Sequence, residues 1–224
     1  MIKLYPLFIF ILFLTGKATG QERLKQAPLD SLFQKHLQAQ NLKKQSPTRA
    51  MTYIPPPFTF GFENFDTHKL KKSAQQLPDS YDLRNHGYVT PVKDQGRYST
   101  CWAFSTLGAV ESRWKMLDDH SYDLSEKNMV DCNGYALNPA DGGNAYIATA
   151  YLSRLKGPVR EAFDPYYTLG EESQCGIKKK PVALVPEARF LPKDIDEVKR
   201  AILNYGAISN SMHAREGSAD DNPM

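Results

Sequence analysis

The chain has 224 residues, of which 41% are apolar and 24% charged, and this balance excludes a wholly disordered protein and fits one globular domain or one domain with a processed extension. The formal net charge of +3 would by itself allow a nucleic-acid or membrane partner. Three cysteines are too few for a disulfide scaffold, and an odd number leaves one thiol over if the other two pair.

The first twenty residues predict a secretory signal peptide. Lys3 gives a positive start, residues 7–14 (LFIFILFL) form an apolar run, and small residues precede a cleavage site after Gly20. The run is shorter than the about 20 residues that cross a bilayer, so no membrane span is expected after the signal is removed. We therefore expect a secreted protein, in an extracellular, periplasmic or lysosome-like compartment where a cysteine pair closes.

Residues 21–76 form a basic leader, with one short helix expected around residues 29–42. Nine basic and four acidic residues give this leader a net charge of 9 − 4 = +5. Residues 77–224 hold 17 basic and 21 acidic residues, a net charge of −4, so the basic character belongs to the leader and no nucleic-acid partner is expected. The leader is either an intramolecular inhibitor of the acidic domain or a solvated linker, and composition leaves both open.

A strong helix is predicted from Cys101 onward, with Thr100 as its N-cap. Its buried face is indicated by apolar residues at a spacing of three to four, namely Trp102, Ala103, Leu107, Val110, Trp114 and Leu117. Cys101 then lies in the first turn, where free backbone N–H groups and the helix dipole favour a nucleophilic thiolate. Gln95 could fold back, so that its amide and the Cys101 N–H form an oxyanion hole. The alternative for a single cysteine is a small buried apolar side chain.

Four segments carry a family resemblance. They are residues 89–96 (VTPVKDQG), 101–105 (CWAFS), 124–132 (LSEKNMVDC) and 141–143 (DGG). From about Leu77 to Ser211 the chain resembles the papain and cathepsin L family of cysteine peptidases. This resemblance implies an α+β, papain-like fold of two subdomains over residues 77–224, with the helical half present and the antiparallel barrel half incomplete.

The resemblance also implies the catalytic residues. Cys101 would be the nucleophile and Gln95 the oxyanion donor. The resemblance also pairs Cys132 with Cys175. A disulfide that closes the loop between these two residues stabilises a fold by about 4 kcal/mol in the chain-entropy model. The positions of the family's other disulfide hold Tyr98 and Ala140 in this chain.

The substrate-binding residues implied by the resemblance surround the glycine pair. Gly142 and Gly143 would lie beside the substrate strand, with Gly143 offering its backbone, and Asn144 and Ala145 would lie near the side-chain pocket. An ordinary turn is the alternative for two consecutive glycines, and both readings are compatible with close backbone approach.

The catalytic histidine is the main difficulty. In the family the His and Asn partners lie about 130 to 150 residues beyond the cysteine, which here falls past Met224. A helix is predicted before His213, with apolar residues such as Ile195 and Tyr205, a cap at Asp194 and an end at Gly206. A strand is predicted to follow over residues 207–212. His213 comes directly after this strand, too early in the chain for the catalytic histidine. We therefore expect that the chain is truncated before its catalytic His and Asn.

The expected function is cysteine-type peptide hydrolysis through an acyl-enzyme, acting on a peptide or protein substrate. Two alternatives remain: a catalytically inactive, papain-like peptide-binding domain, and an acyl-transferring transpeptidase or ligase. No cofactor is expected, and no metal site is expected because no His/Cys cluster has ligand spacing.

Overall fold

The computed structural model describes residues 28–43, 53–57, 76–135, 138, 141–155, 157–169, 175 and 181–212. The predicted signal peptide (1–20) and Ala140, His68 and His213 lie outside these residues. The helices in chain order are α1 (Ser31–Lys43), η2 (Leu83–His86), α2 (Cys101–Asp118), α3 (Glu126–Asp131), α4 (Ala145–Ser153), η3 (Glu161–Phe163), η4 (Tyr166–Thr168) and α5 (Ile195–Tyr205).

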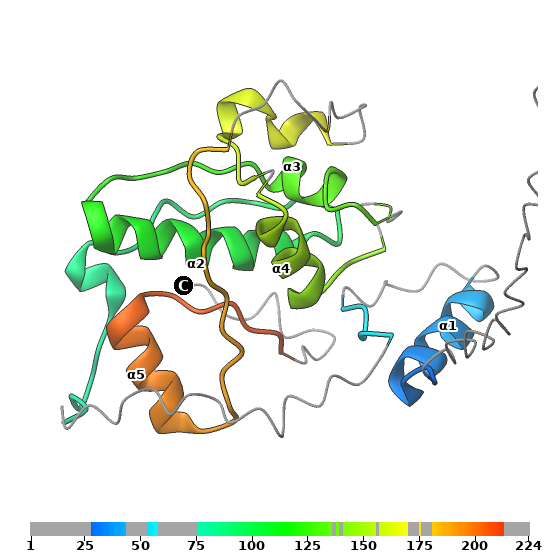
Figure 1. The fold of residues 1–224 in the computed structure, drawn as a ribbon, viewed down its shortest axis with the longest axis horizontal. Helices are drawn as coiled ribbons and strands as arrows, with labels where there is room; N and C mark the ends of the chain where they lie inside the picture. Colours follow the sequence, from blue (N-terminus) through cyan, green and yellow to red (C-terminus); the bar gives the residue numbers. More distant parts are fainter. Residues whose placement is uncertain are drawn as a thin grey trace, which may run out of the picture.

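Helix α2 is the centre of the fold, with α3 and α4 packed along it (Figure 1). Its apolar stripe faces the core as far as Trp114, and Leu107, Leu124 and Tyr151 are fully buried there. Leu117, predicted on the same buried face, is exposed, because it lies in the last turn of the helix, beyond the core. The remaining core residues come from the same three helices and the segments that follow them: Trp102, Ala103, Met129, Val130, Ile147, Ala148, Leu152 and Leu169. The helix predicted from Cys101 is confirmed.

Side-chain caps start α3, α4 and α5. Ser125 accepts a hydrogen bond from the Asn128 N–H at the start of α3, and Asp194 accepts from two N–H groups of α5. Asn144 accepts from the N–H groups of Tyr146 and Ile147 and so begins α4. The predicted α5, its cap and its end at Gly206 are confirmed, as is the short leader helix.

The prediction of a strand over residues 207–212 is wrong for the structure as described. A strand needs a partner ladder, and the described residues contain two isolated β-bridges, Tyr53 with Gly143 and Leu124 with Arg160. Residues 207–212 instead bond to α2: the Ala207 N–H donates to Ser112 Oγ at 3.1 Å, and the Ser209 hydroxyl lies 2.8 Å from that of Ser105. The described domain is therefore the helical half of the expected fold, followed by a segment that lies along α2 (Figure 1).

A disulfide joins Cys132, at the end of α3, to Cys175, as the resemblance implies, with Cα atoms 5.3 Å apart. Cys101 is the free cysteine. In the described part of the chain, no helix combines the length and the apolar character that a membrane crossing requires.

Candidate active site

Cys101 is the first residue of α2 and is partly exposed. Thr100 occupies the N-cap position as predicted, but its side chain makes no capping hydrogen bond. The Thr100 hydroxyl lies instead 2.6 Å from the Tyr166 hydroxyl. Because the N-cap side chain is turned away, it does not compete for the N–H groups of the first turn, which is where an anion is best stabilised.

Gln95 lies at the other end of the turn that leads into α2. Its side-chain amide donates to the Tyr98 carbonyl oxygen at 2.7 Å, and no hydrogen bond joins Gln95 to Cys101 within residues 76–135. An amide group carries two N–H donors, so one remains for a ligand. Gly96 supplies the left-handed backbone of this turn (φ 60°), and its N–H is held by Asp94 at 2.7 Å.

The glycine pair lies against Trp102, the residue that follows Cys101. A Cβ atom at Gly143 would collide with the indole of Trp102. Gly142 has a φ of 88°, in the left-handed region that favours glycine. Gly143 is therefore required by its close packing on Trp102, and Gly142 by its backbone conformation. The packing on Trp102 brings the Gly143 backbone to the start of α2.

The backbone of Gly143 already holds a short piece of the leader. Tyr53 forms a parallel bridge with Gly143, and the Ile54 N–H donates to the Gly143 carbonyl at 3.1 Å. The Asn144 side-chain amide donates to the Ile54 carbonyl at 2.7 Å. Ile54 is itself buried, so both polar groups of its backbone are satisfied by the glycine segment.

Asn144 has two roles that the sequence did not reveal. Its Oδ1 caps α4 while its Nδ2 holds the leader, so the cap fixes the direction of the donor. Ala145, also predicted for the pocket, is the exposed first residue of α4. The next residue, Tyr146, stacks on Phe190 with ring centroids 5.0 Å apart.

The three described histidines pack on aromatic rings. His36 stacks on Phe33 in the leader helix, and His86 stacks on Tyr81 and Tyr88. His120 packs on Tyr122 beyond the far end of α2, so the 18-residue helix, about 27 Å long, lies between it and Cys101. No hydrogen bond joins any of these three to Cys101, while His68 and His213 lie outside the described residues.

A buried ion cluster lies further along α2. The Lys93 ammonium is 2.8 Å from Glu111, 2.9 Å from Asp123 and 3.0 Å from Glu126, and it also donates to the Leu124 carbonyl. Burial opposes the charge on Lys93, but the surrounding carboxylates, Glu126 foremost, raise its pKa above the usual range. Burial raises the pKa of Glu126 to about 7, against the attraction of Lys93. Sequence reasoning missed this cluster, although a glutamate on the buried side of α2 was a signal for it.

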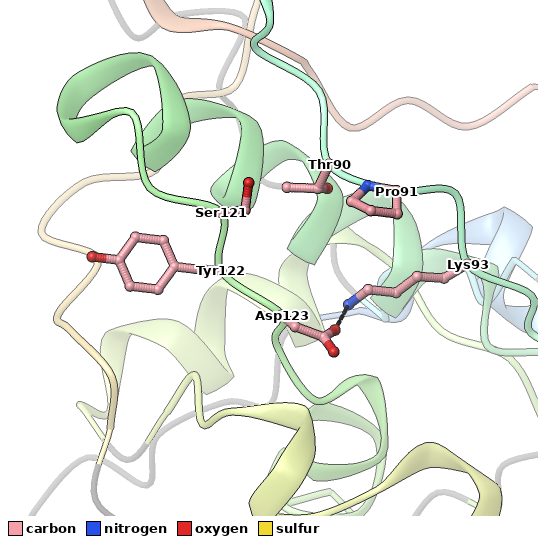
Figure 2. Close-up of a pocket in the computed structure, with 6 residues that line it drawn as sticks. All are labelled: Thr90, Pro91, Lys93, Ser121, Tyr122 and Asp123. Atoms are coloured by element: carbon pink, nitrogen blue, oxygen red, sulfur yellow. Dashed lines mark ion pairs between the residues drawn. The ribbon is translucent and has the colours of Figure 1, made fainter.

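A cavity of about 250 Å³ opens beside this cluster (Figure 2). Its lining is formed by two segments that face each other, with Thr90, Pro91 and Lys93 on one and Ser121, Tyr122 and Asp123 on the other. Lys93 points toward Asp123, and its ammonium is already surrounded by acceptors.

Comparisons with known proteins identify the family of the chain and its similar structures. The family described as Papain family cysteine protease matches residues 77–220. Cathepsin M of Mus musculus is 34% identical over 179 residues, 76% of this chain and 50% of the relative. Cathepsin K of Mus musculus is 32% identical over 176 residues, 78% of this chain and 52% of the relative. The chain thus spans about half the length of these curated relatives.

Among solved structures, the cysteine protease and lectin-like domains of Cwp84, a surface layer associated protein of Clostridium difficile, superpose with a TM-score of 0.59. The two are 25% identical, and the match covers 81% of this chain and 40% of that one. A second structure, the clostridial protease Cwp84 after propeptide cleavage, gives a TM-score of 0.51 at 29% identity, over 56% of this chain and 34% of that one.

Proposed function

The chain belongs to the papain family of cysteine proteases, and on that premise we propose that it is the Cys101-bearing half of a peptide-hydrolysing site. The observation that carries this proposal is the position of Cys101: it is the free cysteine, at the first turn of α2, beside a backbone that binds an extended segment. No other described feature of the chain combines a nucleophile with a peptide-binding backbone.

The proposed reaction proceeds through a thioester. The Cys101 thiolate attacks the scissile carbonyl carbon, an S–C bond forms, and the oxygen takes the negative charge. The Cys101 N–H and the Gln95 amide stabilise that oxyanion. The C–N bond then breaks, the amine leaves with a proton from an imidazole, and water releases the acid. We assign the imidazole to a histidine outside the described residues.

Substrate binding is proposed for Gly142, Gly143, Asn144 and Ala145. The contacts of Ile54 support this, because the Gly143 carbonyl accepts from the Ile54 N–H and the Asn144 side-chain amide donates to the Ile54 carbonyl. An extended substrate residue could make the same two bonds. Since these groups read only backbone, they fit peptides of many sequences, and the substrate class is an unfolded or extended polypeptide.

The leader is proposed as an intramolecular inhibitor. Residues 53–57 occupy the peptide-binding backbone, and Asp30 at the start of the leader helix donates its N–H to the Pro57 carbonyl at 2.8 Å. A peptide cannot bind Gly143 while Ile54 does. An Ile54→Asp variant, which places a charge at a buried position, should therefore label faster than wild type with a peptide-based probe, whereas Leu32→Asp on the exposed face of α1 should not.

Export to an oxidising compartment, extracellular or lysosome-like, is proposed as well. The disulfide between Cys132 and Cys175 is consistent with such a compartment.

The test of the proposed function is covalent labelling of the whole chain by a peptidyl epoxide at mildly acidic pH, in the Ile54→Asp variant so that the leader does not block Gly143. We expect mass spectrometry to find one adduct, on Cys101 of the folded protein, and none on a Cys101→Ser variant. Labelling only after denaturation would contradict the proposal and favour an inactive peptide-binding domain. Where a peptide ester is turned over, capture of the acyl group by an added amine in preference to water would show an acyl transferase instead.

A further inference from the structure

The Tyr166 side chain touches both ends of the turn between Gln95 and Cys101. Its hydroxyl donates to the Gln95 backbone carbonyl at 2.8 Å and lies 2.6 Å from the Thr100 hydroxyl. A phenol carries one proton, so Thr100 is the donor in the second bond. Burial raises the pKa of Tyr166, so its hydroxyl keeps the proton that it donates.

The position of Tyr166 is itself fixed from several sides. Its ring meets Phe104 of α2 edge to face at 4.8 Å and Tyr98 in the same manner at 6.5 Å. Its backbone N–H donates to the Glu161 carboxylate at 2.6 Å. Tyr98 also donates to the Leu169 carbonyl at 3.4 Å, so residues 166–169 and the turn are joined at two points.

We propose that Tyr166 is a positioning residue for the oxyanion-binding donors. Its hydroxyl holds Gln95 and Thr100 at a fixed separation, and so sets the Gln95 amide relative to the Cys101 N–H. The same contact turns the Thr100 hydroxyl away from the first turn of α2, where it would otherwise compete for the N–H groups. Tyr98 stands where the family resemblance places half of a disulfide, so aromatic contacts take the place of a covalent link. This inference rests on the proposed function.

The test uses Tyr166→Phe, which keeps the ring contacts and removes the hydroxyl. Two quantities are compared in the full chain, with Ile54→Asp as the common background that frees Gly143. They are the rate of Cys101 alkylation by iodoacetamide, which builds no oxyanion, and the dissociation constant of a dipeptide aldehyde, measured by its protection against that alkylation. In the aldehyde adduct the thiol sulfur bonds to the carbonyl carbon and the oxygen takes the oxyanion position. We expect the aldehyde dissociation constant to rise about threefold to tenfold, the value of one hydrogen bond, while basal alkylation changes less than about twofold. Tyr167→Phe, on an exposed tyrosine next in sequence, should match wild type.

A double-mutant cycle separates positioning from general support. In a Gln95→Ala background, Tyr166→Phe should add little, because the side chain that it orients is gone. An unchanged aldehyde affinity in Tyr166→Phe, additive losses in the cycle, or an equal fall in alkylation rate and aldehyde affinity would overturn the inference and leave the proposed function standing. Failure of the Ile54→Asp background chain to bind the aldehyde would overturn both.

Discussion

The start and the middle of α2 differ in how far their polar groups are hydrogen-bonded. At the start of the helix, the N-cap hydroxyl is turned away and a free thiol lies in the first turn. In the middle, Glu111 is buried and fully engaged by the Lys93 ammonium, the Thr90 hydroxyl and the Leu124 N–H. The same helix therefore leaves backbone N–H donors available at its start and satisfies the buried charge of Glu111 in its middle.

The physical difference follows from what each half has to do. A buried charge without a partner costs several kcal/mol, so a helix that supports a core satisfies its charges locally. Unsatisfied N–H groups at a helix start cost less, because they face a partly open site and can bind an anion during a reaction. We infer that the ion cluster in the middle of α2 stabilises the domain, whereas the start of α2 activates the Cys101 thiol. Mutations should therefore be able to change stability and thiol reactivity separately.

The largest effect is expected from Lys93→Met, which leaves the buried carboxylates of Glu111 and Glu126 without their cation. Loss of one partner of a buried ion pair costs about 3–5 kcal/mol, so urea unfolding should show a fall of that size. The matched control is Asp123→Asn: the Asp123 carboxylate binds the same ammonium but is 67% exposed, and exposed pairs contribute under about 1 kcal/mol. Equal losses from the two variants would contradict the account.

The next effect is a dependence on pH carried by Glu126. Its pKa is raised by burial from 4.5 to about 7, so between these values the folded state keeps a proton that the unfolded state releases. The free energy of unfolding contributed by Glu126 is therefore highest below pH 4.5 and falls as the pH rises through 7, by at most about 3 kcal/mol.

Glu126→Gln measures this contribution, since an amide resembles the protonated carboxyl. Wild type and variant should unfold with similar free energies at pH 4.5, and the variant should be the more stable at pH 8, as followed by thermal or urea unfolding. Asp79→Asn, at an exposed position, should show no such crossover. A wild type that is more stable than Glu126→Gln at pH 8 would show that Lys93 stabilises the charged carboxylate by more than burial destabilises it, which contradicts a raised pKa.

The smallest of these effects is expected at the start of the helix, from Gly143→Ala. The added methyl group meets the Trp102 indole, and overpacking of this kind costs about 1–3 kcal/mol. Because the same movement displaces the backbone that binds Ile54, peptide-based labelling of Cys101 should fall as well. Gly108→Ala, in α2 with open space around it, should instead stabilise the helix by about 0.5–1 kcal/mol. Unfolding curves that place both variants on the same side of wild type would contradict this contrast.

Local signals predicted the helices better than they predicted the site. The apolar period of α2 and the cap and terminal glycine of α5 act within a few residues, so they could be read from the sequence. The predicted strand over residues 207–212 was wrong because a strand depends on a partner ladder elsewhere in the chain. The short leader helix was found within two residues of its true start.

The contacts that build the site join residues far apart in the chain. Thr100 meets Tyr166 across 66 residues, and Asn144 meets Ile54 across 90. No sequence pattern links residues this far apart. Nothing in the sequence around Pro165 and Tyr166 indicates that the Tyr166 hydroxyl donates to the Gln95 carbonyl. The family resemblance supplied Cys101, Gln95 and the glycine pair, but the groups that orient them came only from the fold.

The most direct test of the central claim is the rate at which Cys101 reacts with iodoacetamide at pH 6 in the folded chain and in the same chain unfolded by urea. The disulfide between Cys132 and Cys175 leaves this thiol as the reacting group in both states. If the start of α2 stabilises the thiolate, the folded chain should react at least about threefold faster, although its thiol is less exposed. A folded chain that reacts no faster than the unfolded one would show that Cys101 is an ordinary buried cysteine.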